Sequence, residues 1–569
     1  MLQINTGKLF VSNEFYENDL CGVLFTNLHF VGGAKLATSA GVLTPASGSS
    51  DIYNCYYELH EKVEKFGEGA GVLVSNSVSS YITDFSALLS FYFSCIASPD
   101  FNVVKRLMSN EVGVSTRCRP SELVSRFFDR NIVCVPSEFS SFVGFVEKLL
   151  SLKRVNYLAV MQSIRTYVTA IHRLSDDLEV SYTLFVAALE SLAQAVDEHK
   201  PTWNDYEERK RKVVDTALAG AASVDAKKVR DALLEIEHTS LSRRFKLFTQ
   251  LHIAPSYFRE GACDIVNPIA EGELDKALSN AYQARSGYIH NIKPLPRLLT
   301  ISPSKSEVMT ISGSPWLTMQ GLTRLARHVI IELVSRQESV EKEEYDYSLE
   351  QPNIVRAPMA FQYWGSRIDP SEDSGFKKLQ GFLGELAACI LSEKTGDERP
   401  SVTNLVDVIE DAISKRDMTR KKFRLPYLAL HAIYKSSVRS EKTLSPLPES
   451  FITELNEPSP ISLIFHVALT SVPSWDTDTL EKVVYKYFST RYHKHAVLAP
   501  PIFEAGMYLM LAEGFRKSDN HELAVFYIGK AMQCLPGNKM LMDFEIAYAK
   551  LPTEINWVSI LLKKAAEEP

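Results

Sequence analysis

The sequence has 569 residues, of which 45% are hydrophobic and 23% charged, and its formal net charge is −7. This length exceeds what one hydrophobic core supports, so about three or four domains are expected. The net negative charge excludes a protein that coats nucleic acid over its whole surface, and any RNA contact would need a local basic patch.

Cysteine usage and the apolar runs predict a compartment. The eight cysteines are scattered, with no CxxC pair and no zinc-ligand spacing, as in a reducing cytosol. The initial Met-Leu-Gln-Ile-Asn lacks the basic and apolar regions of a signal peptide. The most apolar run, residues 86–98, is too short to span a bilayer. We therefore expect a cytoplasmic protein without membrane contact.

Residues 1–150 mix short extended runs with helical ones and predict a small α/β or α+β domain that senses a signal or supports its neighbour. Strands are predicted at 22–26, 71–75 and 131–136, and helices at 86–97 and 120–129. The glycine run at 67–71 lacks the Lys-Ser/Thr ending and the preceding strand of a phosphate-binding loop, so it is predicted to be a turn. A nucleotide-binding regulator would depend on this run alone.

Long amphipathic helices are predicted in residues 151–345. Apolar residues recur at three- and four-residue steps, as in Leu158, Met161 and Ile164. Helices are predicted at 155–174, 176–192, 205–218, 225–248 and 272–290. Pro294 must end the last of them. This part of the chain therefore predicts an antiparallel helical bundle.

An arginine and a histidine lie five residues apart near the end of the last bundle helix, in Ala-Arg285-Ser-Gly-Tyr-Ile-His290-Asn. Histidine transfers protons near neutral pH and arginine grips phosphate with a planar set of donors, so the pair suits metal-independent RNA cleavage. Five residues of a regular helix turn by about 140° and rise by about 7.5 Å. A kink at Gly287 or a second copy of the chain is needed to bring the two groups together.

The spacing alone does not single out this pair. Arginine followed by four to six residues and then histidine occurs at Arg165–His172, Arg285–His290, Arg424–His431 and Arg516–His521. The first pair is predicted to pack inside the bundle. The third brackets a proline at a helix start, and the fourth falls in a predicted turn, where both groups should be solvated.

The run Ser-Tyr-Thr-Leu-Phe-Val-Ala-Ala-Leu-Glu190-Ser-Leu, together with the later Ala-Arg285-Ser-Gly-Tyr-Ile-His290-Asn, resembles the HEPN superfamily and, within it, the ApeA-like branch of bacterial anti-phage defence. The resemblance covers residues 153–335. It implies a helical bundle that works as a homodimer, with a joint endoribonuclease site that needs no metal or cofactor. It implies that Arg285 and His290 are catalytic, supported by Glu190, Ser286 and Asn291.

Two of the supporting residues leave alternatives open. Many family members carry Asn, Asp or His where this chain has Ser286, and this departure favours an inactive relative. Glu190 could pair with Arg285, orient the His290 ring, or be a solvated carboxylate on a helix face.

The resemblance also implies a mechanism. His290 would take a proton from a ribose 2′-hydroxyl or give one to the leaving oxygen, and Arg285 would stabilise the charged phosphate. RNA but not DNA would then be cut. RNA binding is predicted for Arg243, Arg244, Lys246 and Tyr288. The basic clusters alternate with acidic residues, so they could equally form a solvated face of the protein. Tyr288 could instead pack in the core. The expected partners are RNA, a second copy, and a phage or host protein trigger.

Residues 346–375 are predicted to be a linker, because an acidic stretch leads into two prolines. Residues 376–569 are predicted to form a helical domain, with helices at 376–391, 403–413, 427–434, 461–469 and 480–488. Small and large residues in 507–538 fall where a tetratricopeptide-like helix pair needs them. His493 and His495 have no further ligand residue beside them, so no metal site is expected there.

The sequence therefore predicts a mainly α fold with an N-terminal α/β or α+β domain, a central HEPN-like bundle, and a C-terminal helical domain with a tetratricopeptide-like pair. The leading functional hypothesis is a toxic endoribonuclease, a hydrolase of antiviral defence. The alternative is an inactive HEPN-type scaffold that binds a protein partner, which the overall negative charge also favours.

Overall fold

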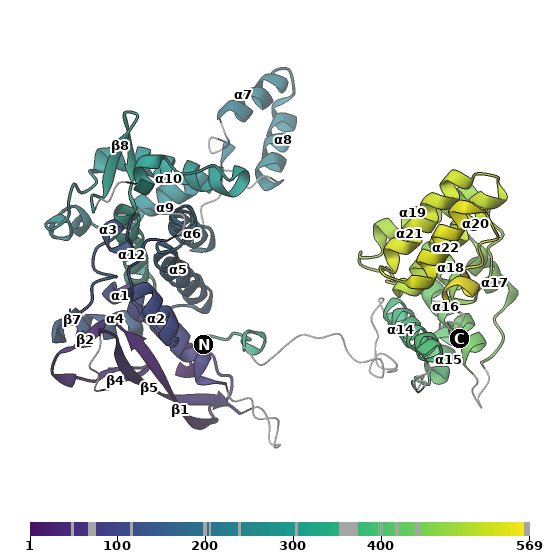
Figure 1. Cartoon of the computed structure of the whole chain (residues 1–569), viewed down its shortest axis with the longest axis horizontal. Helices are drawn as coiled ribbons and strands as arrows, with labels where there is room; N and C mark the ends of the chain where they lie inside the picture. Colours follow the sequence, from purple (N-terminus) through teal and green to yellow (C-terminus); the bar gives the residue numbers. More distant parts are fainter. Residues whose placement is uncertain are drawn as a thin grey trace. The chain divides into compact units, whose positions relative to one another are not determined.

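The computed structural model divides the chain into two compact units, Met1–Arg356 and Ala357–Pro569 (Figure 1). The chain is mainly helical and has an antiparallel sheet near its N-terminus, which confirms this part of the predicted fold class. The predicted linker falls largely outside the residues that the structure describes. These are 1–46, 51–65, 76–113, 118–196, 202–203, 206, 208–236, 241–301, 305–351, 374–395, 398, 400, 402–415, 420–438 and 444–562.

A five-stranded antiparallel sheet, in the order β3-β4-β5-β1-β6, begins the first unit. Its two long strands, β1 (Phe15–Thr26) and β5 (Tyr53–Glu64), pair along their whole length. Cys55, Tyr57 and Leu59 of β5 are buried while the residues between them are exposed, as in a sheet covered on one face. The shorter strands are β3 (Leu36–Thr38), β4 (Gly41–Pro45) and β6 (Ala97–Ser98), and a separate parallel pair is formed by β2 (Leu28–Phe30) and β7 (Ile132–Cys134).

Helix α1 (Val78–Phe93) covers the inner face of this sheet, where the rings of Phe85 and Tyr57 lie 4.9 Å apart. The predicted helix at 120–129 is wrong in extent, since α3 has only four residues. Val124 is extended and Arg126 is left-handed, with a φ of 73°, so the helix cannot continue. The other helices of this layer are α2 (Phe101–Met108), α3 (Pro120–Leu123) and α4 (Pro136–Leu150).

The predicted strand at 22–26 is confirmed within β1, and the one at 131–136 corresponds to the shorter β7. The helix predicted at 86–97 overlaps α1, which begins earlier and ends at Phe93, since Ser94 is left-handed and Ala97 lies in β6. The predicted strand at 71–75 and the glycine run at 67–71 lie outside the described residues. Short 3-10 helices among the described residues of this unit include Ile4–Thr6, Val31–Gly33, Pro255–Phe258, Glu260–Ala262 and Ser348–Glu350.

An antiparallel helical bundle follows, centred on α5 (Arg154–Arg173) and α6 (Leu178–Val196), which confirms the helices predicted there. The predicted helix at 225–248 is represented by two helices, α8 and α9. The hairpin of β8 and β9 and the helix α12 were not predicted. The remaining elements are α7 (Glu208–Ala217), α8 (Ser223–Ile236), α9 (Leu241–Leu251), α10 (Glu271–Asn291), α11 (Arg297–Ile301), β8 (Val308–Ile311), β9 (Ser314–Leu317) and α12 (Met319–Arg336).

One hydrophobic core joins the sheet layer to the bundle. The ring of Phe91 on α1 lies 6.0 Å from that of Phe145 on α4 and 5.2 Å from that of Tyr167 on α5, and Tyr167 lies 5.4 Å from Phe185 on α6. The predicted boundary at residue 150 thus falls inside one compact unit. The shared core fixes the N-terminal layer against the bundle.

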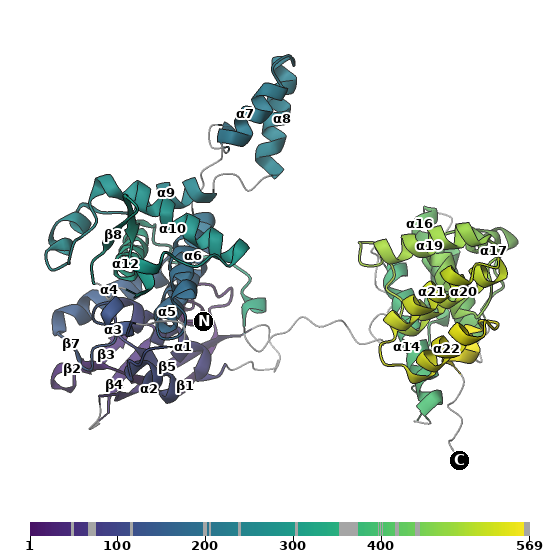
Figure 2. The ribbon, with the colours of Figure 1, turned by 45° about the horizontal axis from the view of Figure 1, so that its top comes forward.

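In the described residues of the second unit, all regular secondary structure is helical, as predicted. The helix predicted at 427–434 is longer, because α16 begins at Lys421. Pro426 was expected at a helix start and instead lies inside the helix, in its second turn. Figures 1 and 2 both show α20 and α21 side by side in an antiparallel pair. The helices are α14 (Ser374–Thr395), α15 (Val406–Lys415), α16 (Lys421–Ser437), α17 (Glu449–Asn456), α18 (Pro460–Ala468), α19 (Thr477–Thr490), α20 (Pro501–Lys517), α21 (His521–Cys534), α22 (Lys539–Lys550) and α23 (Trp557–Leu561). Among the described residues of both units, no helix has the length and apolarity needed to cross a bilayer.

Candidate active site on helix α10

Helix α10 is buried in its first half and exposed toward its end. Leu274 and Leu278 are buried in the core of the bundle. Asn280 fixes the helix to the hairpin, because its Nδ2 donates to the Ser314 hydroxyl over 2.9 Å and to the Pro315 carbonyl over 2.8 Å. The last two turns carry the predicted pair to the surface of the unit.

The helix runs unbroken from Glu271 to Asn291, and Gly287 adopts helical geometry within it. The kink that could have brought the pair together is therefore not present. On a regular helix the side chains of Arg285 and His290 point about 140° apart. A single chain does not aim both groups at one phosphate.

The end of α10 matches the expectation from Pro294, which lies three residues beyond the last helical residue, Asn291. Ile292 closes the helix in a left-handed conformation, with a φ of 51°, and its N–H donates to the Tyr288 carbonyl over 2.9 Å. This conformation is unfavourable for a β-branched residue.

Arg285 forms an ion pair with a carboxylate from another helix. Its Nη2 lies 2.7 Å from Oε2 of Glu190 on α6, and the side chains are 23% and 4% exposed, respectively. The Nε of Arg285 is buried without a hydrogen-bond partner. Of the three roles considered for Glu190, the structure shows the pairing with Arg285, and the solvated carboxylate is wrong.

Tyr282 occupies the other oxygen of the same carboxylate. Its hydroxyl donates to Oε1 of Glu190 over 3.2 Å, and its ring centroid lies 5.9 Å from the guanidinium carbon of Arg285. Burial, together with the nearby Glu190 charge, raises the pKa of Tyr282 to about 12, so the phenol remains a donor. Sequence reasoning missed this role, although Tyr282 lies three residues before Arg285 and therefore on the same helix face.

The remaining predicted site residues on α10 differ in accessibility. His290 and Asn291 are exposed, and Ser286 is partly buried. The imidazole of His290 can therefore meet a substrate or a second copy of the chain without any rearrangement of the core.

Of the predicted RNA-binding residues on α9, Lys246 lies beside the first half of α10 rather than beside its end. Lys246 is held by Asp275, with its Nζ 2.9 Å and 3.1 Å from the two carboxylate oxygens. Asp275 precedes His290 by fifteen residues, which is about 22 Å along the helix. Arg243 is exposed and Arg244 partly buried on the same helix. The structure thus does not bring Lys246 next to the Arg285–His290 pair.

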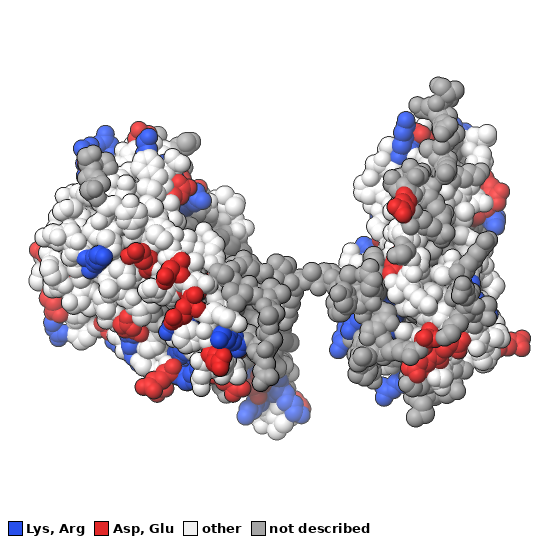
Figure 3. All heavy atoms as spheres, turned by 90° about the horizontal axis from the view of Figure 1, so that it is seen from below, with Lys and Arg blue, Asp and Glu red and all other residues white. Residues whose placement is uncertain are grey.

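Tyr288 is partly buried near acidic residues. Burial raises its pKa, and the carboxylates of Asp177 and Glu179 act in the same direction. These charges oppose an RNA backbone at this point. Figure 3 presents the sheet side of the first unit, where acidic and basic side chains are interspersed.

The arginines of the other three spaced pairs are bound by carboxylates nearby. Arg165 donates to Asp84 over 2.9 Å and 2.6 Å, Arg424 to Glu454 over 3.0 Å, and Arg516 to Glu513 over 2.7 Å. The expectation that Arg516 is solvated is therefore wrong. In the described part of the chain, no group of three or more His, Cys, Asp or Glu side chains is placed to hold a metal ion.

Comparison of the chain with protein-family models, with curated proteins and with solved structures finds no match.

The geometry of the site offers an exposed imidazole at a helix end, about one turn beyond a guanidinium that a buried carboxylate orients. Such a site can move a proton at His290 and place a positive charge nearby, provided that a second surface faces it.

Proposed function

We propose that this chain is a metal-independent endoribonuclease of HEPN type that cuts RNA through the ribose 2′-hydroxyl and serves anti-phage defence in the cytoplasm. In this proposal α5, α6, α9, α10 and α12 make the HEPN-like bundle. The helices α20 and α21 form a tetratricopeptide-like pair that controls access. The observation that supports it most is the exposed His290, which follows an arginine held in place by Glu190.

The active unit of this proposal is a homodimer. Because Arg285 and His290 diverge on an unbroken helix, a joint site needs residues from a second α10. Ile289 and Ile292 flank His290 and are 51% and 74% exposed. Two exposed β-branched side chains at one helix end supply apolar area for that contact.

The chemistry divides between the two groups. His290 would remove the proton of the 2′-hydroxyl or protonate the leaving oxygen, and Arg285 would stabilise the charge that builds on the phosphate. Glu190 would hold the guanidinium at a fixed angle, since its carboxylate is buried and also bound by Tyr282.

A catalytically inactive scaffold that binds a protein partner is the second candidate. The ion pair of Arg285 with Glu190 favours it, because the carboxylate already balances the charge that a phosphate would need. The buried Nε further limits how much of the guanidinium can reach a ligand.

Cleavage assays with the purified full chain distinguish the two. For the nuclease we expect cleavage of RNA but not of the matching DNA, persistence in EDTA, and 2′,3′-cyclic phosphate ends. His290→Ala should lower the rate by about a hundredfold or more. His493→Ala is the matched control, because this histidine is also exposed but lies in the second unit. Equal rates in all three proteins, or cleavage lost in EDTA, would overturn the nuclease.

A mixing experiment tests the joint site. Arg285→Lys and His290→Ala chains should each be inactive, and a mixture should regain activity if one copy supplies the arginine and the other the histidine. Absence of any recovery, with dimers present, would show that the two residues do not act across the interface.

A further inference from the structure

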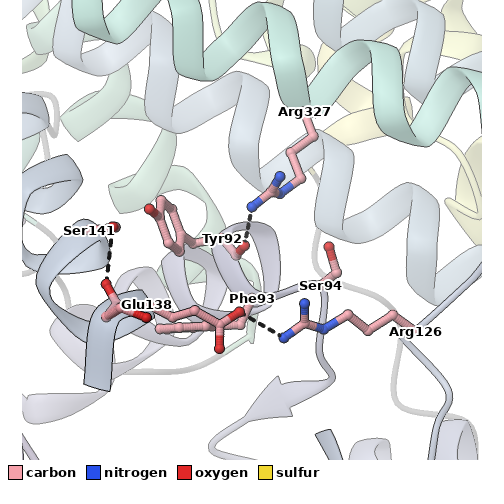
Figure 4. Close-up of a pocket in the computed structure, with 8 residues that line it drawn as sticks. Tyr92, Phe93, Ser94, Arg126, Glu138, Ser141 and Arg327 are labelled. Carbon is pink, nitrogen blue, oxygen red and sulfur yellow. Dashed lines mark hydrogen bonds and ion pairs between the residues drawn. The ribbon is translucent and has the colours of Figure 1, made fainter. Parts of the chain in front are cut away.

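A pocket of about 290 Å³ lies where the N-terminal layer meets helix α12 (Figure 4). Its walls come from the end of α1, the segment after α3, the first turns of α4, and α12. The volume is at the small end of the range for ligand sites. The charged residues that line it are Arg126, Glu138 and Arg327.

Arg327 reaches the pocket from α12. Its Nε donates to the Phe91 carbonyl over 3.1 Å, its Nη2 donates to the Tyr92 carbonyl, and the guanidinium carbon lies 5.6 Å from the centroid of the Tyr92 ring. Among the described residues, no carboxylate forms an ion pair with Arg327. Burial lowers the pKa of this guanidinium, which is consistent with a cation whose charge is not balanced.

Both oxygens of the single carboxylate of the pocket have partners, one of which is Arg126 of the same lining. Oε1 of Glu138 lies 3.2 Å from Nη2 of Arg126, and Oε2 accepts from the Val135 N–H at the start of α4 over 3.1 Å. Glu138 therefore offsets one arginine and caps its own helix. The lining carries two positive charges and one negative charge.

Two residues of the lining hold left-handed backbone conformations that non-glycine residues rarely adopt. Ser94 has a φ of 52° and Arg126 a φ of 73°. Such conformations strain a residue that has a Cβ, and strain of this kind gathers at functional sites. In this protein the two left-handed residues contribute the hydroxyl of Ser94 and the guanidinium of Arg126 to the lining of one small pocket.

A purely structural role accounts for only part of this arrangement. Arg327 caps the last turn of α1 through the Phe91 and Tyr92 carbonyls, as a basic residue at a helix C-terminus commonly does. Capping uses two of its three nitrogens. It explains neither the second arginine beside it nor the open volume between them.

We propose that this pocket binds the phosphoryl group of a small ligand, with Arg327 and Arg126 as the anion-binding side chains and the hydroxyls of Ser94 and Ser137 as further donors. The donors come from separate walls, an arrangement that suits a tetrahedral oxyanion. A planar carboxylate is better matched by one arginine fork. The N-terminal turn of α4 adds a positive partial charge on the same side.

A ligand bound in this pocket would connect the N-terminal layer of the first unit to the helical bundle. Arg126 belongs to the N-terminal layer, whereas Arg327 belongs to α12, which packs against α6. A ligand bound to both is therefore expected to stabilise their contact. The inference does not depend on the ribonuclease proposal.

Titration calorimetry of the full chain with inorganic phosphate, at constant ionic strength, tests this inference. We expect saturable binding and a rise in melting temperature in the wild type, and at least a tenfold weaker affinity in Arg327→Gln and Arg126→Gln. Arg336→Gln is the matched control, because Arg336 lies on the same helix and also donates to a backbone carbonyl, that of Leu251, over 2.7 Å. The control should bind phosphate like the wild type.

Arg126→Gln keeps the test decisive if Arg327→Gln fails to fold, because Arg126 lies outside any helix and its side chain is 42% exposed. No saturable binding at about 10 mM phosphate, or equal binding in the Arg126→Gln variant and the control, overturns the inference. Acetate serves as the second ligand. If it binds as tightly as phosphate with the same sensitivity to the variants, the phosphoryl assignment is wrong.

Discussion

Nη2 of Arg285 on α10 lies 2.7 Å from Oε2 of Glu190 on α6, and this carboxylate is only 4% exposed. The arginine that the proposed chemistry requires is thus also part of the packing between two bundle helices. A buried carboxylate that loses its cationic partner keeps its full desolvation cost. If the proposed function holds, catalysis and stability are coupled at this residue.

The coupling predicts unequal effects on stability. Arg285→Ala should lower the free energy of unfolding by about 2–4 kcal/mol, because Glu190 would stay buried without its partner. His290→Ala should change it by no more than about 0.5 kcal/mol, since that side chain is exposed. Urea denaturation of the full chain measures both.

A double variant separates the two roles of Arg285. Combining Arg285→Ala with Glu190→Leu removes the unpaired charge and should recover most of the lost stability, while RNA cleavage stays absent. If the double variant is as unstable as Arg285→Ala, Glu190 is not the cause of the loss.

Ile292 is a position where a substitution is expected to increase the stability of the fold. Replacing it with glycine should raise the free energy of unfolding by about 1 kcal/mol, because glycine adopts a positive φ without steric cost and this side chain is 74% exposed. The matched substitution Ile289→Gly lies within the helix and should lower it by about 0.5 kcal/mol. A loss of stability in both variants would show that Ile292 is held by contacts rather than strained.

The periodic parts of the sequence were sufficient to place the main helices. Apolar residues at three- and four-residue steps located α5 and α6, and Pro294 bounded the end of α10. The hairpin of β8 and β9 escaped prediction because its strands have four residues each and one contains Pro315, which argues against a strand.

The candidate site was only half predictable. Arg285 and His290 could be recognised from one short stretch, but the shared carboxylate depends on how α6 packs against α10. The Tyr282–Glu190 hydrogen bond joins residues 92 positions apart. No local pattern encodes such a contact, nor a pocket assembled from Arg126 and Arg327.

His172 makes stability depend on pH. Burial lowers its pKa to about 4, and the positive charges of Arg106 and Arg173 act in the same direction. Its Nε2 is buried and has no hydrogen-bond partner. The unfolded chain, with a pKa near 6.5, therefore binds more protons than the folded chain between about pH 4 and pH 6.5.

The resulting stability is fully present above about pH 6.5 and is lost as the pH falls through this window. His172→Phe removes the titrating group. Between pH 7.5 and pH 5 the free energy of unfolding of the wild type should therefore fall by about 1–3 kcal/mol more than that of the variant. Urea denaturation at several pH values measures the difference. Parallel profiles for the two proteins would contradict a buried neutral imidazole.

Arg324 on α12 gathers acceptors from two separate segments, residues 255–262 and Glu307, and supports the region beside α10. Its Nη2 donates to Glu307 over 2.8 Å, and its Nη1 donates to the carbonyls of Tyr257 and Gly261 over 3.0 Å and 3.1 Å. The guanidinium carbon also lies 3.6 Å from the centroid of the Tyr257 ring. Glu307 is fully buried. Only a planar group with several fixed donors can satisfy all of these partners at once.

Arg324→Lys keeps the charge but loses this geometry, so it should lower the free energy of unfolding by about 2–3 kcal/mol. Arg336→Lys, on the same helix and with its side chain 42% exposed, should change it by no more than about 0.5 kcal/mol. Hydrogen exchange should show faster opening of residues 255–262 in the first variant alone. Equal stability of the two variants would mean that charge, rather than the fork of donors, holds these segments together.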